Sequence, residues 1–238
     1  PAEPYQYEMV FEEYGKAVNF ELLHDAGFEI YSQTLGVIPD RLEGLRPCLE
    51  LFVPVVQQAI IEYDASPDRA NAIIVDAVEK YGSFWTYDMA LAGFSVQAQR
   101  DLGLIGNGSD GIVGNMDTGR VQNMIDKIAA AGMDISAGLS VSDIVTNEFI
   151  DTSIGFPEYA PVSMAAVCPS PLVIQTDWFP ESEHGAMYEL IGDGYTVDAD
   201  NMVVRGPLVL GGVPLGIDIE VRTGGPAIGW SPTSSHMY

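Results

Sequence analysis

The sequence predicts an α/β fold. Amphipathic helices follow one another through most of the first 150 residues of the 238-residue chain, and strands alternate with a helix after residue 171. A strand, a helix and a strand in that order are typical of an α/β unit. At roughly 150 residues per domain, the chain suffices for one large domain or two small lobes with a continuous core.

The chain is strongly acidic. It has 34 Asp and Glu against 10 Lys and Arg, which gives a formal net charge of −24 at pH 7. Phosphate binding needs clustered basic residues, so duplex nucleic acid and anionic membrane surfaces are expected to be poor partners, and no nucleic-acid partner is predicted. Apolar residues make up 47% and charged residues 18%, which is typical of a folded chain, and no run of about 18 apolar residues indicates a membrane span.

The first predicted element is a strand over residues 17–23, where apolar and polar residues alternate. A loop follows it up to Gly36. An apolar stripe at helical spacing then runs from Leu49 to Ile60. Pro54 lies inside this stripe, and we expect it to kink or restart the helix.

The next helix has clear boundary signals. Ser66 can cap its first amide groups, Pro67 fits the first helical position, and Gly82 follows its last turn. A third helix is predicted over residues 88–102, and a fourth begins near Asp117 with apolar residues along one side.

A short fifth helix ends the helical part, because Asp143 follows Ser140 at the spacing of a capping box. Residues 156–171 are rich in proline and serine and have no periodicity, so they are predicted to be a linker.

After the linker the pattern changes to strands. Residues 172–176 are predicted to form a buried strand and residues 183–191 a helix. Two further strands are predicted over residues 201–204 and 216–222, the second with clean alternation of apolar side chains.

The two cysteines, Cys48 and Cys168, lie far apart in the sequence and outside any C-x-x-C pair. A metal site or redox motif is therefore not predicted. By themselves they are compatible with one disulfide or with two separate buried thiols.

The densest group of functional side chains lies at residues 176–185, where a predicted strand ends and a helix begins. Ligands bind at such strand ends in α/β sheets. Carboxylates, flat aromatic faces and an imidazole in one group suit a planar, nitrogen-bearing or cationic ligand. In the alternative interpretation, the polar residues cap the helix and the aromatic residues belong to the core. The group consists of Asp177, Trp178, Phe179, Glu181, Ser182, Glu183 and His184.

No catalytic signature is present. The chain has no G-x-S-x-G, H-E-x-x-H or P-loop motif, and His24, His184 and His236 are in no recognisable triad or metal spacing. The acidic stretches 107–110 and 193–200 lack the order of ligands of a calcium loop.

Residues 172–185, LVIQTDWFPESEHG, resemble the opening strand and first loop of ABC-importer substrate-binding proteins of the thiamine-pyrimidine, nitrate, sulfonate and taurine group. Residues 216–230 resemble the second strand and glycine-rich, ligand-facing loop of the same family, and residues 5–150 resemble its carboxyl-terminal portion less specifically. The resemblance implies a periplasmic-binding-protein-like (type II) lobe, with a mixed sheet flanked by helices.

The resembling segments stand in a permuted order. Residues 1–155 resemble the carboxyl-terminal portion of the family, residues 156–171 are the linker, and residues 172–238 resemble the amino-terminal β-α-β portion. Much of the second lobe is then expected to be missing between Tyr238 and Pro1, so a second chain supplying it is an expected partner. A cut and rejoined protein, a separate chain and a residue order that is not the gene's own all remain open.

The resemblance implies binding rather than catalysis, with no cofactor. The chain would be the solute-binding component of an ABC importer, capturing a small planar nitrogen heterocycle similar to a thiamine pyrimidine precursor and delivering it to the permease. Residues 31–34, with His24 and Asp25, are lesser candidates. Trp178 would stack on the ring, Asp177, Glu181 and His184 would hydrogen-bond it, and Gly224, Gly225 and Pro226 would present backbone amides at the cleft.

Family members are exported, so the resemblance also implies a periplasmic or extracellular location, free or as a membrane-anchored lipoprotein. It favours a disulfide between Cys48 and Cys168. Three alternatives remain: binding of a small anion such as a sulfonate or nitrate, a structural or assembly protein that keeps the fold without ligand, and a pyrimidine-synthesising enzyme. The enzyme is disfavoured because it needs a cysteine-rich iron-binding motif.

Overall fold

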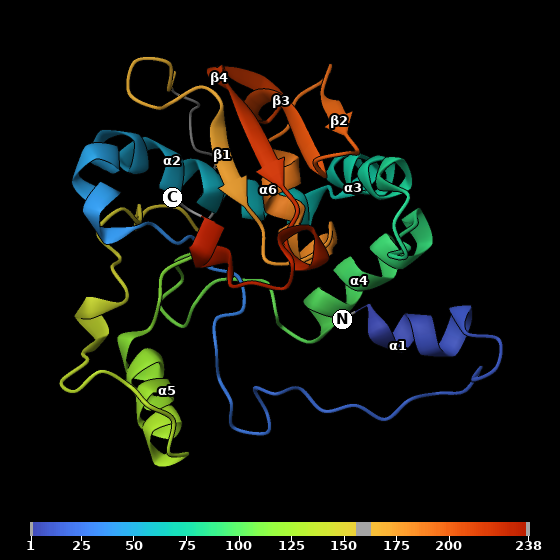
Figure 1. The fold of residues 1–238 in the computed structure, drawn as a ribbon, viewed down its shortest axis with the longest axis horizontal. Helices are drawn as coiled ribbons and strands as arrows, with labels where there is room; N and C mark the ends of the chain where they lie inside the picture. The colour runs from blue at the N-terminus through green and yellow to red at the C-terminus, as the bar shows by residue number, and fades with distance from the viewer. Residues whose placement is uncertain (1, 156–162, 237–238) are drawn as a thin grey trace.

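The computed structural model describes residues 2–155 and 163–236. Within these residues the chain forms six α-helices and a four-stranded mixed sheet, which confirms the α/β class (Figure 1). Of the predicted linker 156–171, residues 156–162 lie outside the described residues.

The sheet has the strand order β1-β4-β3-β2. β1 (Leu172–Gln175) runs parallel to β4 (Val213–Arg222), whereas β3 (Val203–Leu210) is antiparallel to both β4 and β2 (Thr196–Asp198). The strands predicted over residues 172–176 and 216–222 are confirmed as β1 and β4. The strand predicted over 201–204 overlaps only the first two residues of β3, which continues to Leu210, and β2 is a strand that the pattern does not indicate. β1 is an edge strand and is only partly buried, because it has a partner on one side alone.

One face of the sheet is apolar. Along β4 the buried side chains alternate with more exposed ones, as expected for a strand with one face on the core. Helices α2 (Pro39–Ala65), α3 (Asp68–Tyr81) and α6 (Gly185–Glu189) lie together behind the strands in Figure 1. The inward residues of β4 are Leu215, Ile217, Ile219 and Val221.

The long helix α2 differs from the prediction. It begins ten residues before Leu49 and continues through Pro47 and Pro54, both of which lie inside it. A proline in a helix interior costs about 3 kcal/mol. The helix buries Phe52, Val55 and other apolar side chains in the core, and this packing outweighs the local cost.

The other helix boundaries follow the predicted signals closely. Asp88 caps α4 (Met89–Asp101) and Asp117 caps α5 (Thr118–Ala130) through their side chains, while Ser140 and Asp143 form the expected capping box on a single 3-10 turn. The segment predicted as one helix over 183–191 forms a 3-10 turn, η3 (Ser182–His184), followed by the short α6.

At the start of α3 the cap differs from the prediction. Pro67 occupies the N-cap position, and Ser66 belongs to the end of α2 instead. Gly82 ends the helix in the left-handed conformation, as expected.

The strand predicted over residues 17–23 is absent from the structure. Residues 16–22 have no regular hydrogen-bonded structure, and a turn follows over 23–27. Phe20 and Leu23 are exposed, and no described strand lies beside them to accept the ladder bonds that a strand requires. Before this segment, α1 (Glu3–Tyr5) and a π-helical turn, η1 (Gln6–Val10), form an element that the pattern does not indicate.

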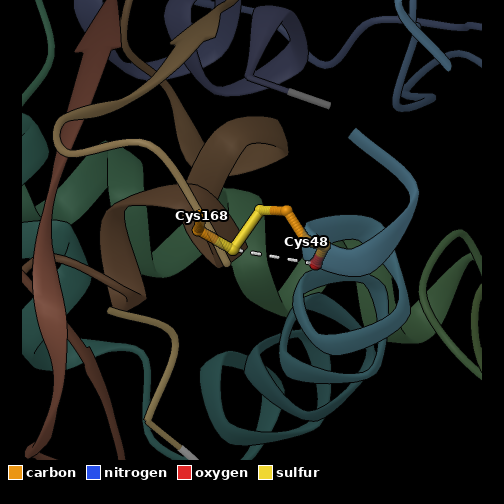
Figure 2. Close-up of a disulfide and its surroundings, with 2 residues drawn as sticks. All are labelled: Cys48 and Cys168. Atoms are coloured by element: carbon orange, nitrogen blue, oxygen red, sulfur yellow. Dashed lines mark hydrogen bonds between the residues drawn. A yellow bond between two sulfur atoms is a disulfide. The ribbon is translucent and has the colours of Figure 1, made fainter. Parts of the chain in front are cut away.

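The two parts of the chain share one core. A single cluster of buried residues combines Ile74 and Ala77 of α3 with Leu208 of β3 and Ile219 of β4. A disulfide between Cys48 and Cys168, with an S–S distance of 2.10 Å, joins α2 to the segment that leads into β1 (Figure 2). The parts before and after the predicted linker therefore form one packed unit.

Candidate functional site

The candidate site lies at the carboxyl end of β1. The backbone amide of Thr176, just after β1, donates to the carbonyl of Arg222 at 2.9 Å, so the ends of β1 and β4 meet at this edge of the sheet. The Thr176 hydroxyl also donates to the Trp178 carbonyl at 2.9 Å and fixes the turn that follows. This pairing brings the segment around Asp177 against the glycines that follow β4.

Gly224 and Gly225 form the floor of this turn. Their backbone amides donate to the carbonyls of Trp178 at 3.1 Å and Asp177 at 2.9 Å. A Cβ atom at Gly224 would lie 2.3 Å from the carbonyl oxygen of Thr176, so only glycine fits this approach.

The expectation that these residues present amides to a ligand is therefore wrong. The amides of Gly224 and Gly225 are already used within the fold. Pro226 carries no amide hydrogen and lies in the short 3-10 turn η4 (Gly225–Ile228). Gly225 instead brings its backbone close to the Trp178 ring, because a Cβ atom at this position would lie 3.2 Å from a carbon of that ring.

Asp177 and His184 form a hydrogen-bonded pair, with 2.9 Å between Oδ1 and Nε2. The Asp177 side chain is 53% exposed, whereas that of His184 is 3% exposed. The hydrogen bond from His184 lowers the pKa of Asp177, so this carboxyl stays ionised at neutral pH. The pair thus presents an accessible carboxylate that a buried imidazole holds in place.

Glu181 differs in its protonation from Asp177. Burial raises its pKa to about 8, and the negative charges of Glu183 and Glu3 add to the shift. Glu181 is thus largely protonated at neutral pH and offers a hydroxyl donor, while Asp177 offers an acceptor.

Aromatic side chains surround the turn. The ring of Trp178 lies 5.3 Å from that of Trp230 and 6.4 Å from that of Trp85, measured between centroids. Phe179 is buried and stacks on Trp85 at 5.5 Å, so it belongs to the core, in line with the alternative interpretation. Trp178 is half-buried and Trp230 is exposed, which leaves apolar surface accessible beside Asp177.

The lesser candidates separate into two groups. Gln33 lies at the site, because its side-chain nitrogen is 3.4 Å from Oδ1 of Asp177. Tyr31 instead bonds the amide of Asp117 through its hydroxyl, and His24 and Asp25 are exposed in the turn over 23–27.

Sequence reasoning missed two site residues, Trp85 and Trp230, whereas Gln33 belongs to the stretch 31–34 of lesser candidates. Trp85 also donates from its ring nitrogen to the Pro180 carbonyl at 3.2 Å, which ties the loop after α3 to the site. All three tryptophans of the chain meet here, so the position of this scarce residue type is the signal that could have found them.

Two cavities lie near this group of residues, and the first of them shares Trp85 with it. One of about 420 Å³ is lined by Gln6, Trp85 and Asp88 among others, and one of about 220 Å³ is lined mainly by apolar residues such as Phe20 and Phe94. Neither is lined by Asp177 or His184, so the candidate site is a surface group on this chain and not the interior of either cavity.

Within residues 2–155 and 163–236, no three His, Cys, Asp or Glu side chains gather in a geometry that would hold a metal ion. No helix among these residues is both long and apolar enough to cross a membrane. Comparisons of the chain with protein-family models, curated proteins and solved structures find no match.

Proposed function

We propose that the protein is the solute-binding component of an ABC importer and binds a small planar nitrogen heterocycle at Asp177, Trp178 and His184. The observation that carries the proposal is the accessible Asp177 carboxylate, held by buried His184 beside the half-buried Trp178 ring. A charged acceptor next to an apolar aromatic face suits a flat ring that carries N–H groups.

Each group has a role in this binding mode. The heterocycle stacks on Trp178, and a ring or exocyclic N–H donates to Asp177. Glu181, protonated at neutral pH, donates to a ring nitrogen that carries a lone pair. In this mode Asp177 and His184 act only as hydrogen-bonding groups, so the chain binds its ligand without transforming it.

Binding of a sulfonate or nitrate has less support. An anion would meet the charge of Asp177, and the amides of Gly224 and Gly225 that would have held it donate to backbone carbonyls. The net charge of −24 also opposes the approach of anions.

The fold and the disulfide support the remainder of the proposal. A mixed sheet with helices packed on one face, and a ligand at the carboxyl ends of parallel strands, fit one lobe of a type II periplasmic binding protein. We propose that a second polypeptide covers the exposed side of the site, and that the protein works in the periplasm or outside the cell, where a disulfide is stable.

Calorimetric titration with aminopyrimidines, sulfonates and nitrate tests this function. We expect only the aminopyrimidines to bind. Trp178→Ala should weaken binding at least about tenfold, because losing a stacked ring costs about 1.5 kcal/mol. Asp177→Asn should weaken it about 10-fold to 100-fold through loss of a charged hydrogen bond, whereas Asp126→Asn on exposed α5 surface should leave affinity unchanged.

The outcomes separate the candidate functions. Binding of the anions alone would replace the heterocycle with a sulfonate or nitrate. Unchanged affinity in Trp178→Ala would reject the stacking role. If no compound binds and native mass spectrometry of the purified protein finds no small adduct, the structural or assembly role becomes the better interpretation.

A further inference from the structure

Residues 27–33 connect helix α5 with the candidate site, and we call this segment the strap. Arg120 of α5 donates to two strap carbonyls, to Glu29 at 2.8 Å and to Ile30 at 2.6 Å. The Arg120 guanidinium also lies over the Tyr31 ring, 4.1 Å from its centroid. One arginine thus makes contact with three consecutive residues of the strap.

Two more contacts hold the strap on the same helix. The Tyr31 hydroxyl accepts a hydrogen bond at 2.8 Å from the backbone amide of Asp117, and the Lys127 ammonium donates to the carbonyl of Gly27. Positions 117, 120 and 127 lie on one side of a helix with 3.6 residues per turn. The strap is therefore docked along one face of α5.

The other end of the strap reaches Asp177. Gln33 donates from its side-chain nitrogen to Oδ1 of Asp177 at 3.4 Å, and the same oxygen lies 2.9 Å from Nε2 of His184. In Figure 1 α5 lies well away from the sheet, at the lower edge of the molecule. Through the strap, this peripheral helix is connected to the candidate site.

The bond from Gln33 to Asp177 is too weak to order the strap by itself. Both side chains are exposed, the bond is long, and residues 28–31 form no regular secondary structure. Fixing several residues of irregular backbone costs more conformational entropy than one exposed hydrogen bond returns. The contacts with Arg120 and Lys127 must therefore supply the order that places Gln33.

We propose that Arg120 is a positioning residue that acts through the strap, and that Gln33, delivered by it to Asp177, determines which ligands that carboxylate accepts. Gln33 occupies one lone pair of Oδ1 and brings its own amide oxygen beside it. A ligand must either share Asp177 with this neutral amide or displace it. A ligand with two neighbouring N–H groups, one for each oxygen acceptor, is favoured over one with a single donor.

The first test needs no ligand. Carbon-13 NMR follows the titration of the Asp177 carboxyl in wild type, Gln33→Ala, Arg120→Ala and the double variant. The charged or titratable neighbours of Asp177 are His184 and Glu181. Because the hydrogen bond from Gln33 lowers the pKa of Asp177, we expect its loss to raise that pKa.

We expect equal upward shifts of the Asp177 pKa in the two single variants and no further shift in the double variant, after correction for the lost charge. Arg46→Ala is the control for the loss of one surface arginine charge. Arg46 is also a surface arginine with ion pairs and a ring contact, 5.3 Å from the Phe149 centroid, but its described contacts do not include the strap. Additive shifts, or an Arg120→Ala shift no larger than that of Arg46→Ala, would overturn the proposal.

Hydrogen exchange over residues 28–31 reports on the strap directly. Arg120→Ala should speed this exchange, and Gln33→Ala should leave it unchanged. If Arg120→Ala does not fold, Tyr31→Phe removes only the hydroxyl bonded to Asp117 and should give smaller changes in the same direction. Unchanged exchange in a folded Arg120→Ala or Tyr31→Phe variant would contradict the role of α5.

The ligand part of this inference rests on the proposed function. Once an aminopyrimidine is shown to bind, Gln33→Ala should reduce the preference for two-donor over one-donor compounds, and an unchanged preference would reject the specificity role. If no aminopyrimidine binds while the titration and exchange behave as expected, the proposed function fails and the positioning role of Arg120 stands.

Discussion

The disulfide between Cys48 and Cys168 should supply a large share of the stability of the fold. We consider the variant in which both residues are alanine, which leaves no free thiol and little altered packing at two buried positions. The two cysteines are separated by 120 residues, and closing a loop of that length in the unfolded chain corresponds to about 5 kcal/mol at 25 °C. Since domains are typically stable by about 5–15 kcal/mol, the variant should be marginal.

Urea unfolding at pH 7, followed by tryptophan fluorescence and far-UV circular dichroism, measures this loss. Residual structure in the denatured chain makes about 5 kcal/mol an upper value, so we expect a decrease in the free energy of unfolding of about 2–5 kcal/mol. Wild type with a reductant should approach the variant, and the variant should not respond to the reductant. A decrease below about 1 kcal/mol with an unchanged urea slope would refute the loop-entropy reasoning.

Two other predictions concern the region around η3 and α6. Gly185→Ala should reduce the free energy of unfolding by about 3 kcal/mol or more, because its Cβ would lie 2.1 Å from a ring carbon of buried Tyr63. The matched Gly44→Ala in α2, where no atom lies within 4 Å, should raise it by about 0.5–1 kcal/mol, and equal urea midpoints would contradict the steric argument. The raised pKa of Glu181, about 8 against 4.5, favours the folded state at low pH, so stability should fall as pH rises from 4.5 to 8. In urea titrations at a series of pH values, Glu181→Gln should reduce this loss of stability with rising pH. If the free energy of unfolding of Glu181→Gln depends on pH as steeply as that of wild type, the loss comes from other groups.

Local signals predict the helices well. The caps at Asp88 and Asp117 and the left-handed Gly82 act within one turn of chain, so they are visible in the sequence. The errors occur where packing decides. The alternation of residues 17–23 is typical of a strand, but no described strand lies beside this segment to pair with it. Pro54 is tolerated inside α2 because this helix packs in the core.

The site shows the same division. Asp177, Trp178 and His184 lie within eight residues, so their type and spacing are enough to indicate a candidate site. Trp230 and Gln33 come from segments that meet this turn only through the pairing of β1 with β4 and the docking of the strap on α5. No local pattern encodes such contacts, and the expected role of the Gly224 and Gly225 amides is wrong for the same reason.

The close approach at Gly224 has an evolutionary consequence. A methyl group there would collide with the carbonyl oxygen of Thr176, whatever ligand the protein binds. Selection for folding should therefore keep glycine at position 224 even in a lineage that has changed its ligand. Residue 177, in contrast, can change when the ligand changes. Among divergent descendants, an invariant glycine after β4 facing a variable residue after β1 would mark a shared fold with altered specificity.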